Sequence, residues 1–212
     1  MVIEKSTIKC EAVFNEEHTH RFSWKRVWGK DKPVATIIML NPCQADDIIM
    51  DTTTSLVVNN IARLEQFSGV EVLNLFSRLT SKLNFRWNSD EDLNQPENDS
   101  HIQKVAASSP CIIVAWGKSA DTHQRIANRA QEVLELLEPY RDKVHVISDG
   151  VRDGLHPLTP AIRSQWTLKP FDWSEYDAEK AKEAKAAKEA VKATKKATKK
   201  AAKETAEDDT NK

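Results

Sequence analysis

The chain has 212 residues, of which 40% are hydrophobic, and carries 31 basic against 32 acidic side chains. This length supports one core of roughly 150 to 170 residues but hardly two. The balanced charge argues against a broad phosphate-binding face, because non-specific nucleic-acid binding depends on clustered Lys and Arg, although a local basic patch remains open. We therefore expect one domain over residues 1–173 and an extension over residues 174–212.

The extension is rich in Ala, Lys and Glu and has no aromatic residue after Tyr176. Such a segment cannot bury a core, so we expect a disordered chain or a solvated helix. Its 11 Lys and 9 acidic residues leave 20 basic and 23 acidic residues in the rest of the chain. The simplest role is a solubilising appendage, and an arm that binds a nucleic acid or a protein partner is the alternative.

The cysteines and the N-terminus point to a reduced, cytoplasmic protein, because the three Cys lack CxxC spacing and no signal-peptide run opens the chain. No stretch approaches 18 apolar residues, so we expect no membrane span. The six His are dispersed without a helical i, i+4 pair, and the five Gly form no phosphate-binding loop. We therefore expect no metal, no dinucleotide or ATP, and no other cofactor.

Hydrophobic periodicity predicts alternating strands and helices after an N-terminal β-hairpin. The hairpin strands are Lys9 to Phe14 and Arg21 to Trp24. The expected later elements are strands over 34–40, 70–76, 111–116 and 143–147 and helices over 52–67, 98–108 and 119–137, with a long polar excursion over 77–97. This order predicts an α/β fold: a three-layer α/β/α arrangement around a four-stranded, mainly parallel sheet.

Polar residues follow each of these four strands, at the edge of the sheet where α/β proteins hold ligands. The first strand ends in Asn41-Pro42, followed closely by Asp46, and the second contains Asn74 and is followed by Arg78. The third strand ends in Trp116-Gly117, and the fourth leads to His156. We expect these residues to share one edge.

The residue types at this edge suit a planar, hydrogen-bonding ligand. An Asn side chain donates and accepts together, which matches the edge of a nucleobase, and Phe76, Trp87 or Trp116 could stack on its ring. Each residue also has a simpler explanation: Asn41 as a turn former, Asn74 as a strand-end cap, Trp116 as core, Arg78 as a surface ion pair and His156 as a satisfied loop histidine.

Seven ordered strings over roughly residues 10–170 resemble the DUF1643 family of bacterial and phage proteins. They are RFSWKRVW (21–28), IIMLNPCQAD (37–46), Asp51-Thr52, VLNLFSRLTS (72–81), PENDSHI (96–102), IVAWG (113–117) and GLHPLTP (154–160). The chain departs from the usual pattern at Cys43-Gln44, where Ser-Thr is common after Asn-Pro, and at Asp51-Thr52-Thr53, where many members have Asp-Pro-Thr.

Four shorter motifs resemble, more distantly, the uracil-DNA glycosylases and their mismatch-specific relatives: Leu40-Asn41-Pro42, residues 69–74 (GVEVLN), Ala115-Trp116-Gly117 and His156-Pro157. The resemblance implies a glycosylase-like fold in which Asn41 positions or activates a water, Asn74 binds the base edge and His156 stabilises the departing base. Asp46 could be the stronger base. The segment Leu158-Thr159-Pro160 departs from the family's DNA-penetrating loop, which argues against duplex DNA as substrate.

Two hypotheses follow. The chain is an enzyme that hydrolyses or otherwise handles an N-glycosidic bond, with catalytic Asn41, Asp46 and His156; its partner is a nucleobase, a nucleotide or single-stranded nucleic acid. The remaining expected contacts to that partner come from six residues: Pro42, Asn74, Phe76, Arg78, Trp116 and Gly117. The alternative is an inactive binding module that sequesters a nucleotide-like ligand or binds a protein. Cys43 follows the same strand end, but no His is near it in sequence, which argues against a nucleophile.

Overall fold

The computed structural model describes residues 1–43, 49–182 and 185. The chain forms two compact units, Met1–Phe171 and Asp172–Lys212. The elements of the first unit are, in order: β1 (Lys9–Phe14), β2 (Arg21–Val27), β3 (Val34–Met39), α1 (Thr52–Arg63), β4 (Gly69–Asn74), α2 (Asp90–Leu93), α3 (Pro96–Ser108), β5 (Ile112–Val114), the 3-10 helix η1 (Gly117–Thr122), α4 (Gln124–Leu137), η2 (Glu138–Lys143), β6 (Val144–Ser148), η3 (Pro160–Ile162) and β7 (Thr167–Pro170).

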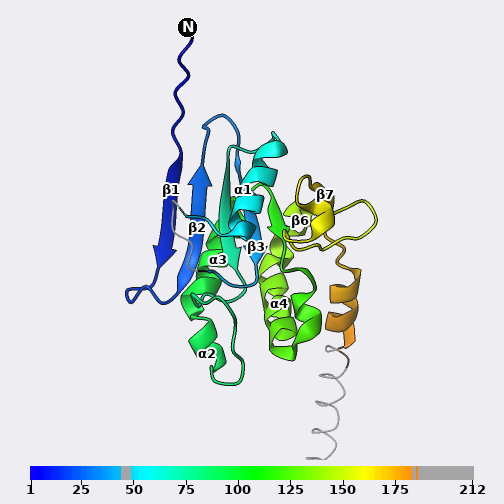
Figure 1. The fold of residues 1–212 in the computed structure, drawn as a ribbon. Helices are drawn as coiled ribbons and strands as arrows, with labels where there is room; N and C mark the ends of the chain where they lie inside the picture. The colour runs from blue at the N-terminus through cyan, green and yellow to red at the C-terminus, as the bar shows by residue number, and fades with distance from the viewer. Residues whose placement is uncertain (44–48, 183–184, 186–212) are drawn as a thin grey trace, which may run out of the picture. The chain divides into compact units, whose positions relative to one another are not determined.

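The sheet has seven strands in the order β1-β2-β4-β3-β5-β6-β7 (Figure 1). The predicted sheet of four strands was therefore too small. The four predicted strands, β3 to β6, form its parallel centre. The hairpin joins one side because β2 pairs antiparallel with β4, with Trp24 opposite Val72. β7 joins the other side through antiparallel pairing with β6. The α/β class is confirmed.

Alternation along the strands divides the core between the two faces of the sheet. Ile37, Val72 and Ile113 lie in one buried cluster with Val57 and Ile61 of α1. The residues between them, such as Ile38 and Leu73, are fully buried and point to the opposite face, which α3 and α4 cover (Figure 1). Helices therefore pack on both faces, as the strand-helix alternation predicts.

Helix boundaries differ from the sequence prediction where local capping intervenes. The helix expected over 119–137 begins only at Gln124, because His123 has an extended φ of −156° and caps α4 through its side chain. The segment before it, Gly117–Thr122, is a 3-10 helix. The short helix α2 was not predicted; Ser89 and Asp92 form a capping box around it.

The second unit is described only in part. Residues 174–182 are helical, and the Trp173 and Tyr176 rings meet edge to face at 5.4 Å. Most of the Lys-rich stretch lies outside the described residues, so the expectation of a disordered or solvated tail remains a prediction. Among the described residues, no helix combines the length and the apolar character needed to cross a bilayer.

Candidate functional site

The carboxyl ends of β3, β4, β5 and β6 meet at one edge of the sheet, because these strands are parallel neighbours. The edge is held together by backbone bonds between successive loops. The N–H groups of Leu75 and Phe76 donate to the carbonyls of Met39 and Leu40, and Ala115 N–H donates to Ile38 O. The segments that follow β3, β4 and β5 thus begin side by side.

Asn41 lies just beyond β3 and is half-buried. Its Nδ2 donates to the carbonyl of Thr80 at 2.7 Å, and Thr80 N–H donates to Pro42 O at 3.1 Å. Asn41 therefore fastens the β4–α2 loop to the end of β3. This leaves Oδ1 as the atom of Asn41 that can accept a hydrogen bond from a ligand or water, since no described residue donates to it. Asp46, predicted in the same loop, lies outside the described residues.

Asn74 is the last residue of β4, opposite Met39, and is 2% exposed. Its backbone carbonyl accepts a hydrogen bond from Asn98 Nδ2 at 3.1 Å. Its own Nδ2 is buried and meets no acceptor among the described residues. A buried donor without a partner costs about 1–3 kcal/mol, so such groups are infrequent and call for an explanation.

Gly117 and His156 are in direct contact at the end of β5. Gly117 has a φ of 62°, and a Cβ added there would lie 2.7 Å from the His156 Cβ. Burial lowers the pKa of His156, so the imidazole is neutral at pH 7. Leu158 N–H donates to Nδ1 at 3.1 Å, which assigns the proton of the neutral ring to Nε2. His156 therefore presents an uncharged N–H donor.

Asp51 was not among the predicted site residues, although the Asp-Thr-Thr-Thr run before an apolar helix is an N-cap signal. Its carboxylate accepts from the N–H groups of Thr53 and Thr54 and from the Thr54 hydroxyl. Burial acts to raise its pKa, but these hydrogen bonds and one from the Cys43 thiol outweigh that effect, so the pKa of Asp51 is lowered.

The pKa of Cys43 shifts in the opposite direction to that of Asp51. Burial, with the neighbouring Asp51 charge, raises the pKa of its thiol to about 11. The thiol is therefore protonated at neutral pH, which removes the thiolate that a cysteine nucleophile needs.

The other residues predicted to contact a ligand are buried or have partners of their own. Pro42 and Trp116 are buried, Trp116 at 9% exposure. Arg78 pairs through its backbone with His20 and donates its N–H to Leu93 O at 3.0 Å. Burial and then the Arg78 charge lower the pKa of His20. Phe76 is 2% exposed and meets Phe85 edge to face, so its face is not open for stacking.

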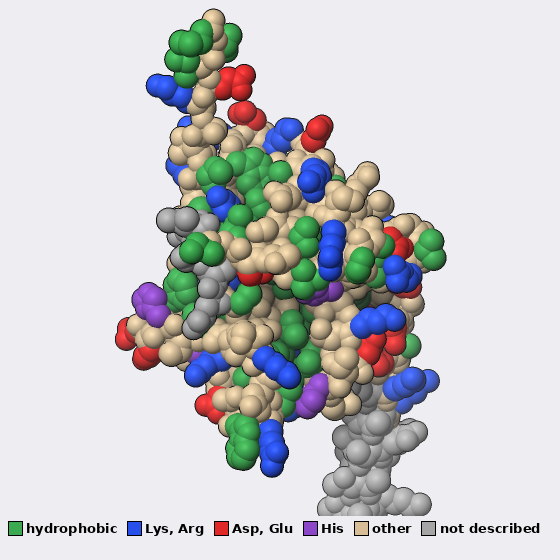
Figure 2. Space-filling view, in the orientation of Figure 1, with side chains coloured by type: hydrophobic (Ala, Val, Ile, Leu, Met, Phe, Trp, Pro, Cys, Tyr) green, Lys and Arg blue, Asp and Glu red, His purple; other side chains and the backbone are tan. Residues whose placement is uncertain are grey.

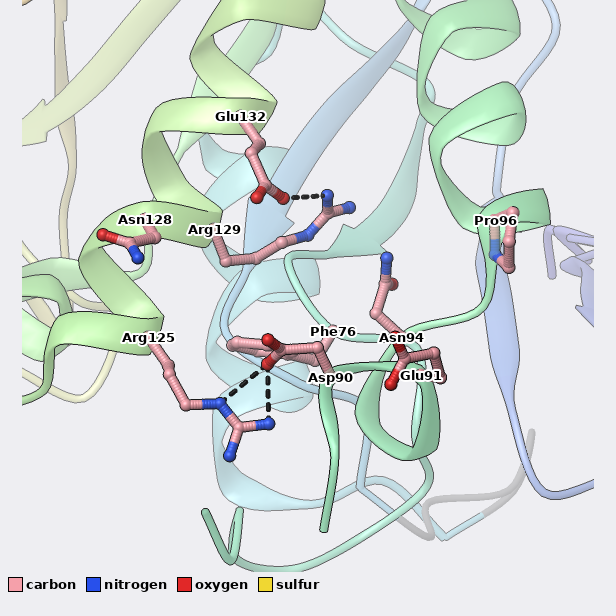
Figure 3. Close-up of a pocket in the computed structure, with 9 residues that line it drawn as sticks. All are labelled: Phe76, Asp90, Glu91, Asn94, Pro96, Arg125, Asn128, Arg129 and Glu132. Atoms are coloured by element: carbon pink, nitrogen blue, oxygen red, sulfur yellow. Dashed lines mark hydrogen bonds and ion pairs between the residues drawn. The ribbon is translucent and has the colours of Figure 1, made fainter.

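A hollow of about 230 Å³ lies over Phe76, between α2, α3 and α4 (Figure 3). Arg125 closes it on one side with an ion pair to Asp90, and Arg129 lines it with an ion pair to Glu132. The carboxylates already neutralise both guanidinium groups, so this hollow is a packing feature of the α4 face. Within residues 1–43 and 49–182, no three His, Cys, Asp or Glu side chains gather as metal ligands would.

The comparisons with known proteins identify the family. The model of DUF1643, described as a protein of unknown function, matches residues 21–158, and the chain therefore belongs to this family. No curated protein and no solved structure matches it.

Proposed function

We propose that this DUF1643 protein recognises a nucleobase at the carboxyl edge of its sheet and hydrolyses the N-glycosidic bond that joins the base to a sugar. The observation that carries the proposal is the buried Nδ2 of Asn74, which lacks an acceptor among the described residues. A base carbonyl would supply that acceptor. The order of the motifs around Asn41, Asn74 and His156, which resembles that of uracil-DNA glycosylases, supports the same roles.

His156 would stabilise the departing base. Cleavage of an N-glycosidic bond leaves negative charge on the base, and a fixed donor that faces this charge lowers the barrier. A neutral imidazole with its proton on Nε2 can donate a hydrogen bond to this charge, and the hydrogen bond from Leu158 N–H to Nδ1 holds this tautomer. Removal of one such donor costs about 10²- to 10³-fold in rate.

Asn41 would hold the attacking water through Oδ1, because its Nδ2 is bound to Thr80 O. Carboxamides are weak bases, so this arrangement gives slow hydrolysis unless Asp46 supplies the base. Asp51 does not suit that task, because its carboxylate is occupied by the first turn of α1 and by the Cys43 thiol.

A binding module without catalysis is the second candidate. The hydrogen bond from Asn41 Nδ2 to Thr80 O favours it. An amide that fastens a loop to β3 has a structural role whether or not a ligand is present. Under this reading, Asn74 and His156 would bind a nucleotide-like ligand, or the surface would bind a protein, and no bond would break.

The test is mass spectrometry of free bases released from nucleosides, nucleotides and single- or double-stranded DNA with normal and modified bases. The key variant is His156→Asn, since an Asn oxygen can still accept from Leu158 N–H but the Nε2–H donor is gone. His18→Asn, at an exposed turn with φ of 53°, is the control. Release lost in His156→Asn and kept in the control supports hydrolysis. No release from any substrate, with a nucleotide retained in native mass spectrometry, supports the binding module.

A further inference from the structure

A second hollow, of about 450 Å³, lies in the loop between β4 and α2. It is lined by Lys82, Leu83, Asn84, Phe85, Arg86 and His123. Lys82 and Arg86 are exposed cations, and none of the lining side chains is acidic. Figure 2 shows a basic and a hydrophobic side chain projecting side by side at the end of the molecule where this loop lies.

Aromatic rings line the same hollow and extend from it. The Phe85 ring stacks on His123, with centroids 4.2 Å apart and planes 22° from parallel. Trp87, the next residue beyond Arg86, is 73% exposed, and the Arg86 guanidinium lies 4.9 Å from its ring centroid. Cations interleaved with an open indole face match the chemistry of a phosphate chain that carries stackable bases.

Hydrogen bonds from α4 fix the shape of this loop. Arg125 of α4 donates from Nη1 to the carbonyls of Phe85 and Asn88, both at 3.0 Å, and its charge is neutralised by Asp90. The Arg125 guanidinium also lies 5.0 Å from the Phe85 ring centroid. The hollow therefore exists before any ligand binds, which lowers the entropic cost of binding.

The hollow is connected to the proposed nucleobase site by η1. This helix begins at Gly117, which contacts His156, and His123 follows its last residue directly. The segment is kinked at Lys118, so at about 2 Å of rise per residue its six residues span at most about 12 Å, a length that a few nucleotides of one strand can cover.

We propose that the hollow at residues 82–87 binds the sugar-phosphate backbone of single-stranded nucleic acid, with Lys82 and Arg86 on phosphates and a base stacked on Trp87. This inference rests on the proposed function and deepens it: the nucleotide whose base enters the edge site belongs to a strand. The basic segment is short and is followed in the chain by Asp90, Glu91 and Asp92 in the first turn of α2, which fits a single strand better than a duplex with charge on two backbones.

The test is fluorescence anisotropy of a fluorescein-labelled 12-nucleotide single strand with the full-length chain. Arg86→Glu removes a phosphate contact and Trp87→Ala removes base stacking, so each should weaken binding about tenfold or more. Both positions are exposed and do not support the fold. Lys104→Glu, the same charge change at an exposed position on α3, is the control and should stay within about twofold. With two phosphates neutralised, the logarithm of affinity should fall against the logarithm of salt with a slope of about −1.4.

Three results would overturn the inference: no binding of the strand by the native chain, equal loss in Lys104→Glu and Arg86→Glu, or displacement of the strand by poly-aspartate as readily as by an unlabelled strand. The last result would indicate an acidic protein partner instead. Base release from free nucleosides separates this inference from the proposed function, because a free nucleoside has no strand to occupy residues 82–87. Release by the native chain that is lost in His156→Asn would support hydrolysis even if the native chain failed to bind the strand.

Discussion

The backbone of Gly117 lies against the side chain of His156, at a separation that leaves no room for a Cβ: one built on Gly117 would come 2.7 Å from the His156 Cβ and 3.2 Å from its backbone nitrogen. Gly117 also has a φ of 62°, in the left-handed region that favours glycine. The turn after β5 therefore sets where the His156 imidazole can lie.

Gly117→Ala should destabilise the protein and displace His156. The left-handed conformation costs an L-residue about 1–2 kcal/mol, and the close contact adds overpacking of about 1 kcal/mol or more. Urea unfolding measures the loss. Gly154→Ala is the matched control, since Gly154 has a φ of 69° but nothing within 4 Å of its added Cβ. Equal losses for the two variants would show that the contact with His156 carries no cost.

Acid should destabilise the folded state through its buried histidines. Burial lowers the pKa values of His20, His101 and His156 below the ordinary 6.5. Between the folded and unfolded pKa values the unfolded chain binds more protons, so the free energy of unfolding falls as pH drops below about 6.5. The stability is fully present above that pH.

Urea unfolding between pH 7.5 and 5.5 measures this slope, to which each histidine contributes up to about 1.4 kcal/mol per pH unit. His156→Gln should reduce the slope, because it removes one of the three histidines whose pKa burial lowers. A slope that is the same in the native chain and in His156→Gln would rule out this contribution.

The sequence predicted the strands well where they are buried on both faces. Runs such as residues 34–40 and 70–76 are apolar because α1 covers one face and α3 and α4 the other. β7 (TLKP) gave no such signal, since it is a short edge strand with exposed or half-buried residues only. Pairing between β2 and β4 could not be predicted either, because strand register depends on tertiary contacts that the local hydrophobic periodicity does not encode.

In the candidate site, too, the sequence predicted positions along the chain but not tertiary contacts. The carboxyl-edge position of Asn41, Asn74 and Trp116 follows from parallel strands and was predictable. Where their side chains find partners was not: Asn41 binds Thr80 O, 39 residues away, and Trp116 is buried. Asp99 lies in the first turn of α3 and also pairs with Arg129 of α4, 30 residues away. Such partners lie far apart in the chain, and no spacing rule connects them.

Cys43 should react slowly with alkylating reagents. Its thiol pKa of about 11 leaves little thiolate at pH 8. Iodoacetamide labelling with peptide mapping reads each cysteine separately, and Cys43 should label more slowly than a cysteine in the urea-unfolded chain. Asp51→Asn keeps an N-cap oxygen but removes the charge beside the thiol, so labelling of Cys43 should speed up while the helix cap persists. Rapid labelling of Cys43 in the folded native protein would contradict the assignment.

Arg129 should be the most costly arginine to remove among the ion pairs described. It is 5% exposed, and its Nε donates to Leu75 O at 2.8 Å while its remaining nitrogens bind Asp99 and Glu132. Arg129→Met leaves the buried Leu75 carbonyl and the Asp99 carboxylate without these donors. Because Asp99 is partly exposed, we expect a loss near the lower end of the range for buried pairs, about 3 kcal/mol in urea unfolding.

Two comparisons sharpen this last prediction. Arg152→Met removes an ion pair with Asp149 whose arginine is 60% exposed, and it should cost less than about 1 kcal/mol. Arg129→Lys keeps the charge but offers one ammonium in place of a planar fork, so it should recover only part of the loss. Full recovery in Arg129→Lys would mean that charge alone matters there. Since Arg129 ties α4 to the segment after β4, its loss should also loosen the wall that supports Phe76 and the 82–87 loop.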